Sequence, residues 1–600
     1  MNREEILVVV LSRNYSTGLS VIRSLGTQGY TVDLVASAPR EGASEFIQKS
    51  KFIRKSVEVT AKKVKDEDDL ALVEALKAYE GEHPTKPVLI AADDYTAAIM
   101  DNHRDELKDI FIMPGIVGGE PGSLVHMMDK SVQGEIARSV GIKTPEEWVV
   151  SLRDEEFSLP EGIIYPCYVK PLGSIIGHKQ EMERCDDRIE LVEHLKKLRE
   201  NYPNRSVLVQ KFMYIDEEYD LEGVCMDQEI ILPGIIWKQV VANYDRGVPL
   251  YGKLFPTEKF GAFMDKVREF LREFHYFGMF DLGFNVIGDE FYFNELNLRS
   301  GGTNYVYFES GVNLSEIFVK AALKEPISEE ERCAKEFGKT YIYEKVAWDD
   351  YFHDNLTRKE VNEMIENADI HIMVNDYDPI PGELFNEEIA EEIRQKRNKE
   401  IRENCIALCM EDTGWERADT REKLRNIRQQ LGIGYKDIAA YKAWRFDPEN
   451  LEEEYKKAVE RQERIRKNRE DCIAKTMEST GWDMDRAKAE IKDARERLGV
   501  SYKDYASFEL WKYPVEEQEE VYQKALRRRE RIAQQKEQCI TYAMDIMGWD
   551  REHAAEQIKD ARKRLGISYK DYYKYKFCLI PVDEQQAEYD KILSEKEKDK

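Results

Sequence analysis

The chain has 600 residues, enough for more than one domain and for the core of a large α/β enzyme. Its formal net charge of −27 argues against a nucleic-acid partner or an anionic membrane surface, because clustered Lys and Arg make such contacts. No apolar run is long enough to cross a bilayer, and the nine Cys include no CxxC pair, which is typical of reduced thiols packed as small hydrophobes. We therefore expect a cytoplasmic protein without membrane insertion.

A βαβ unit is predicted at the start of the chain. The apolar run 6–11 predicts a buried strand, a glycine-bearing loop and a periodic apolar segment predict a helix, and 31–36 predicts the next strand. The loop lacks a GxGxxG pattern, which makes a dinucleotide site a weak prediction, although an anion can bind at such a helix N-terminus. A further strand, 87–92, ends in Asp93-Asp94, at the edge where open α/β sheets usually bind ligands.

The next block, which begins near residue 114, carries two lysines suited to phosphate. Lys130 precedes the predicted helix 131–140, and Lys170 lies on the short strand 166–171, just before the small-residue loop 173–179. A lysine beside such a loop suits a triphosphate, because the ammonium supplies a point charge and glycines let backbone N–H groups approach closely. Another predicted strand, 207–213, follows.

Two strands of alternating aromatic and polar residues flank the turn 288–290 and predict a β-hairpin. Side chains two apart share a strand face, so Glu295, Asn297 and Arg299 project together. Asp281 can lie opposite them on the partner strand. Oxygen ligands beside a guanidinium favour Mg²⁺ with bound phosphates. The alternative is a solvated hairpin face with a surface ion pair.

From about residue 395 the composition changes to charged helices, and an internal repeat of 67 residues appears. Three copies keep one register, as shown by Cys405, Cys472 and Cys539, by Trp415, Trp482 and Trp549, and by Tyr435, Tyr502 and Tyr569. Such copies indicate tandem helical bundles with Cys and aromatic residues in their cores. The charged connectors are predicted to be exposed helix faces. A protein-interaction or assembly role is the default expectation for such an array.

The second copy shows the predicted order of helices within a bundle. One helix stops at Gly481, and a second stops at Gly499. Ser501 caps a third helix over 502–511, and Pro514 then opens a long charged connecting helix. Helical repeats of this kind resemble those appended to bacterial surface-polymer enzymes.

The order of these features resembles the ATP-grasp superfamily, in particular its carboxylate–amine ligases of the D-aspartate-ligase-like type, over residues 1 to about 390. The resemblance implies an α/β (α+β) ATP-grasp fold with an N-terminal Rossmann-like pre-ATP-grasp domain, followed by all-α tandem repeats. The expected domains are the pre-ATP-grasp domain at 1–115, the ATP-grasp domain at 116–330, a C-terminal extension at 331–394 and the repeats at 395–600. The strand-like segment 370–374 resembles the end of such a ligase core.

The resemblance also implies a nucleotide set, made of two phosphate-binding lysines, a phosphate-covering loop, an adenine-binding strand and a ribose-binding acid. Its members are Lys130, Lys170, Gly173, Ser174, Gly177, Gln210, Lys211, Phe212, Met213 and Glu218. Glu217 is a close rival of Glu218 for the ribose. Lys211 departs from the family pattern, since an acid is common after the Gln.

The same resemblance assigns Asp281, Glu295 and Asn297 to Mg²⁺, with Mn²⁺ as the alternative ion. It assigns Arg299 and Lys170 to catalysis. Asp281 is shorter than the more frequent Glu. The backbone N–H groups of the next loop are expected to hold a substrate carboxylate beside the metal, the alternative being a plain strand-end turn. The residues of this loop are Ser300, Gly301, Gly302, Thr303 and Asn304.

The family reaction transfers the γ-phosphoryl group of ATP to a carboxylate, and an amine then attacks the acylphosphate to give an amide, ADP and phosphate. A small-molecule carboxylate and amine, such as amino acids or short peptides, are therefore expected as substrates, with a protein partner bound through the repeats. One alternative is an ATP-grasp enzyme with a non-amine acceptor. Another is a nucleotide-binding scaffold that acts through the repeats.

Overall fold

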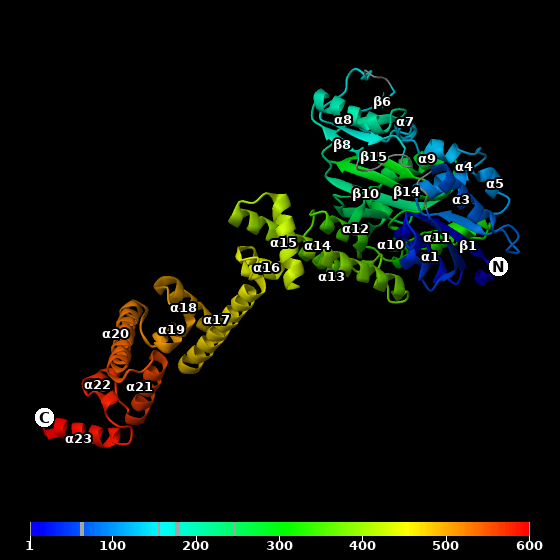
Figure 1. The fold of residues 1–600 in the computed structure, drawn as a ribbon. Helices are drawn as coiled ribbons and strands as arrows, with labels where there is room; N and C mark the ends of the chain where they lie inside the picture. Colours follow the sequence, from blue (N-terminus) through cyan, green and yellow to red (C-terminus); the bar gives the residue numbers. More distant parts are fainter. Residues whose placement is uncertain (1, 61–64, 154–156, 174–180, 245–246, 599–600) are drawn as a thin grey trace. The chain divides into compact units, whose positions relative to one another are not determined.

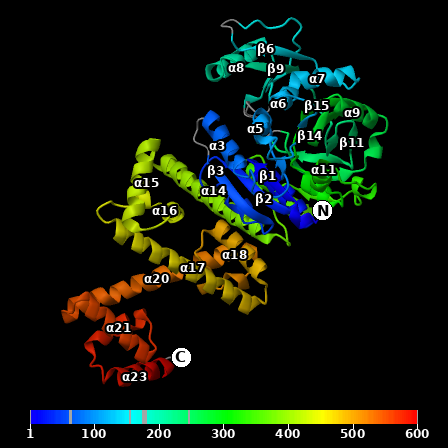
Figure 2. The same ribbon diagram turned by 90° about the vertical axis from the view of Figure 1, so that its right-hand side faces the viewer.

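The chain divides into two compact units, Met1–Asn398 and Lys399–Lys600, in the computed structural model. The structure describes residues 2–60, 65–153, 157–173, 181–244 and 247–598. Figure 1 and Figure 2 show strands and helices in the first unit, while the described part of the second unit is helical. No helix among these residues combines the length and the apolar composition needed to cross a membrane.

The predicted βαβ unit is present and forms the start of a parallel sheet. Its four strands are ordered β3-β2-β1-β4, and both neighbours of β1 run parallel to it. The elements are β1 (Leu7–Ser12), α1 (Tyr15–Gly26), β2 (Thr31–Ala38), α2 (Glu45–Gln48), β3 (Ile53–Thr60), α3 (Lys65–Lys77), β4 (Val88–Ala91), α4 (Asp94–Asn102) and α5 (Arg104–Leu107). Asp93 accepts a hydrogen bond from Thr96 N and so caps α4 at the carboxyl edge of this sheet.

A nine-stranded sheet forms the middle of the unit, with the path β15-β14-β10-β12-β13-β16-β17 and with β11 and β5 beside β10 and β14. Its strands are β5 (Gly115–Ile116), β10 (Glu217–Met226), β11 (Glu229–Ile231), β12 (Ile235–Val241), β13 (Pro249–Phe255), β14 (Tyr276–Ile287), β15 (Glu290–Asn297), β16 (Thr340–Ile342) and β17 (Ile370–His371). The predicted hairpin is β14–β15, with Asp281 directly opposite Asn297. The strand predicted at 370–374 is shorter, since β17 ends at His371.

A third, antiparallel sheet carries Lys170 and the predicted adenine strand. Its strands, in the order β6-β9-β7-β8, are β6 (Glu147–Ser151), β7 (Cys167–Pro171), β8 (Glu183–Cys185) and β9 (Ser206–Lys211). Helices nearby in the chain are α6 (Ser123–Met127), α7 (Lys130–Ser139) and α8 (Arg188–Asn201). An apolar core that includes Val169, Leu195 and Val209 packs α8 on the sheet.

Two apolar cores join the N-terminal sheet to the nine-stranded sheet. One contains Val8 and Tyr341, and the other contains Leu7 and Phe280. The remaining helices of the unit are α9 (Phe263–Arg272), α10 (Asn304–Glu309), α11 (Leu314–Ala322), α12 (Glu344–Phe352), α13 (Arg358–Asn367) and α14 (Pro379–Thr413). Because α14 runs past Asn398, it belongs to both units.

We expect a protein that ends at Asn398 to stay folded and to bind ATP, because its core contacts lie before that residue. The buried guanidinium of Arg23 donates to Asp378 at 3.0 Å, and Lys396 donates to the carbonyl of Tyr351 at 2.6 Å. A chain cut at 395 lacks the Lys396 contact and should melt at a lower temperature. Thermal unfolding and nucleotide binding of both truncated proteins test this, and aggregation of the longer one would contradict it.

The second unit contains the three predicted bundles. Its helices after α14 are α15 (Arg417–Leu431), α16 (Tyr435–Tyr441), α17 (Leu451–Thr480), α18 (Met484–Leu498), α19 (Tyr502–Ser507), α20 (Val515–Met547), α21 (Arg551–Leu565), α22 (Tyr569–Lys574) and α23 (Gln585–Lys598). Cys405, Cys472 and Cys539 are each buried in a separate apolar core. The prediction of structural thiols agrees with this burial, while Cys333 of the first unit is exposed.

One predicted helix of the repeat was too long. The helix expected over 502–511 ends at Ser507, and a 3-10 turn, Leu510–Lys512, follows it. Glu509 lies between them with φ of 50°, in the left-handed region that ends a helix. Lys442 and Lys576 occupy the same repeat position with φ of 49° and 53°, so the break is part of the repeat.

Candidate active site

Two cavities of the first unit share a wall. The smaller has a volume of about 270 Å³ and the larger about 620 Å³. Glu295 and Gly247 line both, so the cavities adjoin at the end of the β14–β15 hairpin. We call the smaller one the nucleotide cavity, after the predicted nucleotide set that lines it. We call the larger one the acidic cavity, after its Asp and Glu side chains.

The nucleotide cavity brings together most of the predicted nucleotide set. Its lining includes Lys130, Lys170, Gln210, Lys211, Phe212, Met213 and Glu218. Gly173 lies outside this lining, and its backbone bridges Asp129 beside Lys130. Ser174 and Gly177 fall outside the residues that the structure describes.

Both predicted phosphate lysines reach the wall that the cavities share. Lys130 is buried at the start of α7, and its Nζ donates to Glu295 Oε2 at 2.6 Å. Lys170, near the end of β7, donates from Nζ to Asn294 Oδ1 at 3.4 Å. Burial and then the charge of Lys130 lower the pKa of Lys170 to about 8. Two neighbouring cations favour an anion between them.

The predicted adenine strand and the predicted ribose acid have defined positions, although the strand predicted over 207–213 ends at Lys211. Gln210 is buried on β9, and its amide donates to Glu147 Oε2 at 2.9 Å. Glu218 lines the nucleotide cavity from β10, whereas its rival Glu217 accepts a hydrogen bond from the hydroxyl of Tyr219 at 2.7 Å. Alternation along β10 therefore favours Glu218 over Glu217 for a contact with nucleotide.

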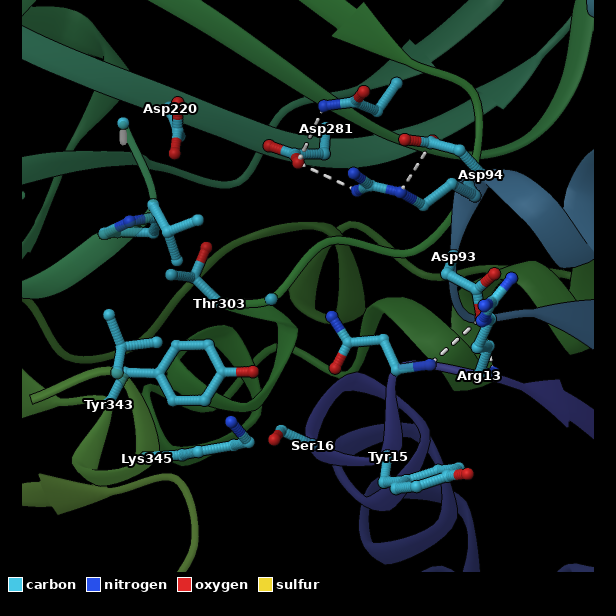
Figure 3. A pocket seen from close by; sticks show the side chains of 18 of the residues that line it. Arg13, Tyr15, Ser16, Asp93, Asp94, Asp220, Asp281, Thr303, Tyr343 and Lys345 are labelled. Carbon is cyan, nitrogen blue, oxygen red and sulfur yellow. Dashed lines mark hydrogen bonds and ion pairs between the residues drawn. The ribbon is translucent and has the colours of Figure 1, made fainter. Parts of the chain in front are cut away.

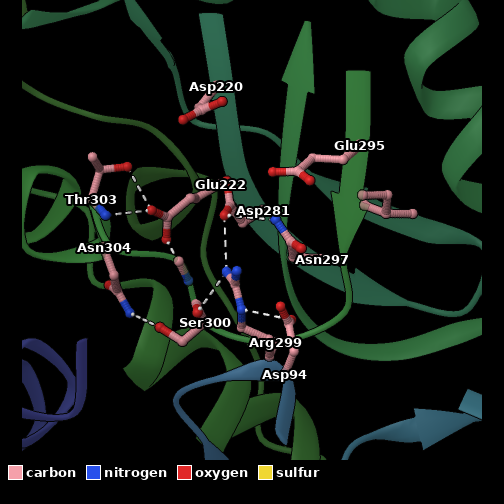
Figure 4. Close-up of polar contacts among 12 residues, drawn as sticks. Asp94, Asp220, Glu222, Asp281, Glu295, Asn297, Arg299, Ser300, Thr303 and Asn304 are labelled. Atoms are coloured by element: carbon pink, nitrogen blue, oxygen red, sulfur yellow. Dashed lines mark hydrogen bonds and ion pairs between the residues drawn. The ribbon is translucent and has the colours of Figure 1, made fainter. Parts of the chain in front are cut away.

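The acidic cavity is lined by the three predicted metal residues and by Arg299, which Figure 4 shows close together, whereas the other predicted catalytic residue, Lys170, lines the nucleotide cavity. Arg299 lies between two carboxylates, donating from Nε to Asp94 at 3.0 Å and from Nη1 to Asp281 at 2.9 Å. Asn297 donates to the same Asp281 oxygen at 3.2 Å. Although burial opposes it, the charges of Asp94 and Asp281 raise the pKa of Arg299, which stays a cation.

The loop after β15 differs in part from its prediction. Its amides do hold a carboxylate, but that carboxylate belongs to Glu222 of β10, which accepts from Gly301 N at 3.1 Å and from Thr303 N at 2.8 Å. The amides of Gly301 and Thr303 are therefore engaged within the chain. Gly302 and Thr303 still line the cavity. Burial and then Asp281 raise the pKa of Glu222 to about 8.

Ser300 and Asn304 of this loop are buried and contact one another. The amide of Asn304 donates to the hydroxyl of Ser300 at 2.9 Å. Neither residue lines the acidic cavity. This placement supports a structural role for the two side chains.

Sequence reasoning missed a second row of charges on β10 and β12. Asp220 lines the acidic cavity and lies opposite Gly283 of β14, whose other neighbour in the sheet is Glu295. Lys238 donates to Asp220 Oδ1 at 2.8 Å. Burial raises the pKa of Asp220 to about 7, against the opposing charge of Lys238. The period-two pattern of acids at Glu218, Asp220 and Glu222 was the signal available in the sequence.

The opposite wall comes from the N-terminal sheet and α12 (Figure 3). Asp93 accepts from the backbone N–H groups of Arg13 at 2.6 Å and Asn14 at 3.2 Å, which fixes the β1–α1 loop at the cavity. Lys345 lines the same wall and pairs with Asp349 at 2.7 Å. Of this wall, the sequence indicated only the edge at Asp93 and Asp94 and an anion site in the loop.

The predicted metal residues fit an ion that is shared with phosphate. No group of three or more His, Cys, Asp or Glu side chains within the described ranges is arranged to hold a metal alone. Asp281, Glu295 and Asn297 supply two carboxylates and one amide oxygen. Mg²⁺ is usually held by one or two carboxylates, with phosphates and water as its other ligands. The donor set therefore suits Mg²⁺ bound together with a nucleotide.

Comparisons with known proteins match part of the chain. The chain is 23% identical over 220 residues, 36% of its length, to the carbamoyl phosphate synthase large chain of Lachnoclostridium phytofermentans, and it covers 20% of that protein. It is 22% identical over 311 residues, 47% of its length, to D-aspartate ligase of Enterococcus faecium, and it covers 70% of that protein. No family model matches the chain. The chain thus spans about a fifth of the first relative.

A solved structure aligns with part of the chain at a low TM-score. The biotin carboxylase domain of 2-oxoglutarate carboxylase from Hydrogenobacter thermophilus, in complex with MgADP, ADP and bicarbonate, aligns with a TM-score of 0.44 and 17% identity. The alignment covers 56% of this chain and 73% of that chain. The similarity to the two curated relatives confirms the resemblance to the ATP-grasp superfamily. ATP-grasp relatives bind ATP or ADP with Mg²⁺. The helical C-terminal region has no assigned family.

Proposed function

We propose that the first unit is an ATP- and Mg²⁺-dependent ligase that activates a carboxylate as an acylphosphate and joins it to an amine, with release of ADP and phosphate. The observation that carries this proposal is the pair of adjoining cavities that share Glu295. One cavity gathers the nucleotide set, and the other gathers acids around Arg299. The similarity to D-aspartate ligase supports an amine as the acceptor.

Within this proposal the nucleotide cavity binds and orients ATP. Lys130 and Lys170 neutralise the phosphates at the shared wall, Glu218 binds the ribose, and the segment 210–213, at and beyond the end of β9, binds the adenine. Mg²⁺ would be held by Asp281, Glu295 and Asn297, where it would neutralise charge on the transferred phosphoryl group. Phosphoryl transfer needs in-line positioning and charge neutralisation more than covalent help from the protein.

Before ligands bind, cations of the chain neutralise the acids of the site. Lys130 lies 2.6 Å from Glu295, and Arg299 lies 2.9 Å from Asp281. We infer that these pairs separate when nucleotide binds: Glu295 and Asp281 would be free to hold Mg²⁺, and Lys130 and Arg299 would be free to contact phosphate. Arg299, with its fixed fork of donors, then stabilises the oxyanion formed when the amine attacks.

The substrate carboxylate would lie in the acidic cavity beside Arg299. Gly302 and Thr303 line it there, while the amides engaged by Glu222 keep the loop in place. Asp220, paired with Lys238, is next to the space that remains for the amine. Amino acids or short peptides fit a cavity of about 620 Å³.

ADP release by the purified chain tests the proposal. ATP and Mg²⁺ are supplied with amino acids, dipeptides and bicarbonate, singly and in pairs. We expect ADP only when a carboxylate and an amine are both present, together with an amide product of the corresponding mass. ADP with bicarbonate alone would favour a carboxylase-type reaction, and a hydroxylamine-sensitive product would favour a non-amine acceptor. ATP binding without turnover over the whole panel would favour the scaffold.

A further inference from the structure

We propose that the second unit carries a docking surface for an acidic, amphipathic segment of a partner protein, formed by α20 and the end of α19. This open surface, the α20 groove, has a volume of about 760 Å³. Its cations are Lys524, Arg527, Arg528, Arg529 and Arg531. The proposal concerns the repeats and does not depend on the activity of the first unit.

Four of the five cations of the α20 groove have no counter-charge among the described residues. Arg529 pairs with Asp504 at 2.7 Å, and the other four have no ion pair within tail residues 399–598. Lys524, Arg528 and Arg531 follow one another at helical spacings of three and four residues, where like charges repel and destabilise a helix. Carboxylates of a partner would remove that repulsion and would form bidentate contacts with arginine.

Apolar side chains run through the same surface. Val521, Ala525 and Ile532 lie on one face of α20, and Phe508 borders them from the end of α19. The Ile532 side chain is 43% exposed. An apolar stripe flanked by cations fits a helical segment that has apolar residues on one face and acids beside them. A long polyanion fits less well, because the net charge of −27 repels it beyond the groove.

The groove is a feature of one connector and not of the repeat. Shifted by 67 residues, its α20 positions fall on α17, where Glu454 stands for Val521, Glu460 for Arg527 and Gln462 for Arg529. Those positions carry three cations and two acids on α17, against five cations and no acid on α20. Because α17 and α20 form the same kind of helix with different charges, the fold of the repeat does not require the extra cations of α20. Those cations can therefore serve binding.

The repeat supplies both the disrupting variant and its control. R527E/R529Q places the α17 residues on α20, and R461E/R464Q makes the same change of charge on α17. Arg, Glu and Gln have similar helix propensities, so both variants should keep their helices, which circular dichroism checks. E460R/Q462R on α17 tests the reverse change.

The probe is a labelled peptide of about 20 residues with Leu on one helical face and Glu beside it, which spans ~30 Å as a helix. Fluorescence anisotropy with the full chain should give one bound peptide and weaker binding in higher salt. We expect R527E/R529Q to raise Kd about tenfold or more, R461E/R464Q to leave it unchanged, and E460R/Q462R to add a second bound peptide.

Several results would overturn the proposal. They are equal losses in both charge variants, equal binding of a peptide with Ser in place of Leu, tighter binding of an oligonucleotide of the same charge, or no peptide binding up to about 1 mM. Sedimentation of the chain without peptide separates one further case. If wild type dimerises and R527E/R529Q is monomeric, the groove binds a second copy of the chain and the partner-protein proposal is wrong.

Discussion

Glu295→Gln is expected to lower Mg²⁺-dependent ADP formation about a hundredfold or more. Glu295 lines both cavities, and its carboxylate contacts Lys130 at 2.6 Å. The amide keeps the shape but removes the charge that the proposed ion needs. Since the substitution also releases Lys130, ATP binding without Mg²⁺ should not weaken. Steady-state ADP release and isothermal titration with ATP measure the two effects separately.

The matched control for this prediction is Glu290→Gln on the same strand. Glu290 pairs with Lys143 at 2.9 Å, and both side chains are largely exposed. An exposed pair of this kind contributes little to stability, so this variant should retain wild-type activity. If Glu295→Gln retained full ADP formation as well, the ligase proposal would be lost and the scaffold would become the better explanation.

The hairpin was predictable because a strand alternates with a period of two. That period alone places Glu295, Asn297 and Arg299 on one face, and the turn brings Asp281 to the opposite strand. The period also marks Asp220 and Glu222 as one face of β10. The period does not tell which hydrogen-bond donor each acid meets. For this reason the contact of Glu222 with the Ser300–Asn304 loop was missed.

Contacts between distant segments were beyond such reasoning. Asp94 and Arg299 are 205 positions apart, and they meet because two apolar cores fix the N-terminal sheet against the nine-stranded sheet. The sequence indicated only that Asp94 lies at a ligand-binding edge. The helix end at Ser507 was missed for a local reason: Glu509 adopts a left-handed conformation without the glycine that usually signals it.

Arg299→Lys is expected to lower kcat about a hundredfold to a thousandfold, with a small change in KM for ATP. A lysine carries one point charge and cannot reproduce the two directions in which Arg299 meets Asp94 and Asp281. If Asp281 held the proposed ion, Asp94 would be the carboxylate that still held the guanidinium. We therefore expect Asp94→Asn to lower kcat about tenfold by loosening Arg299.

A double-mutant cycle tests whether Asp94 acts through Arg299. If it does, Asp94→Asn should cost little more in the Arg299→Lys background, because the contact is already altered. Asp105 of the neighbouring helix α5 forms an exposed ion pair with Lys108, and Asp105→Asn, which breaks this pair, is the control. This variant should leave kcat unchanged. Additive losses in the cycle would mean that Asp94 acts independently of Arg299. A loss for Arg299→Lys without any loss for Asp94→Asn would limit catalysis to the hairpin and leave the N-terminal sheet a structural role.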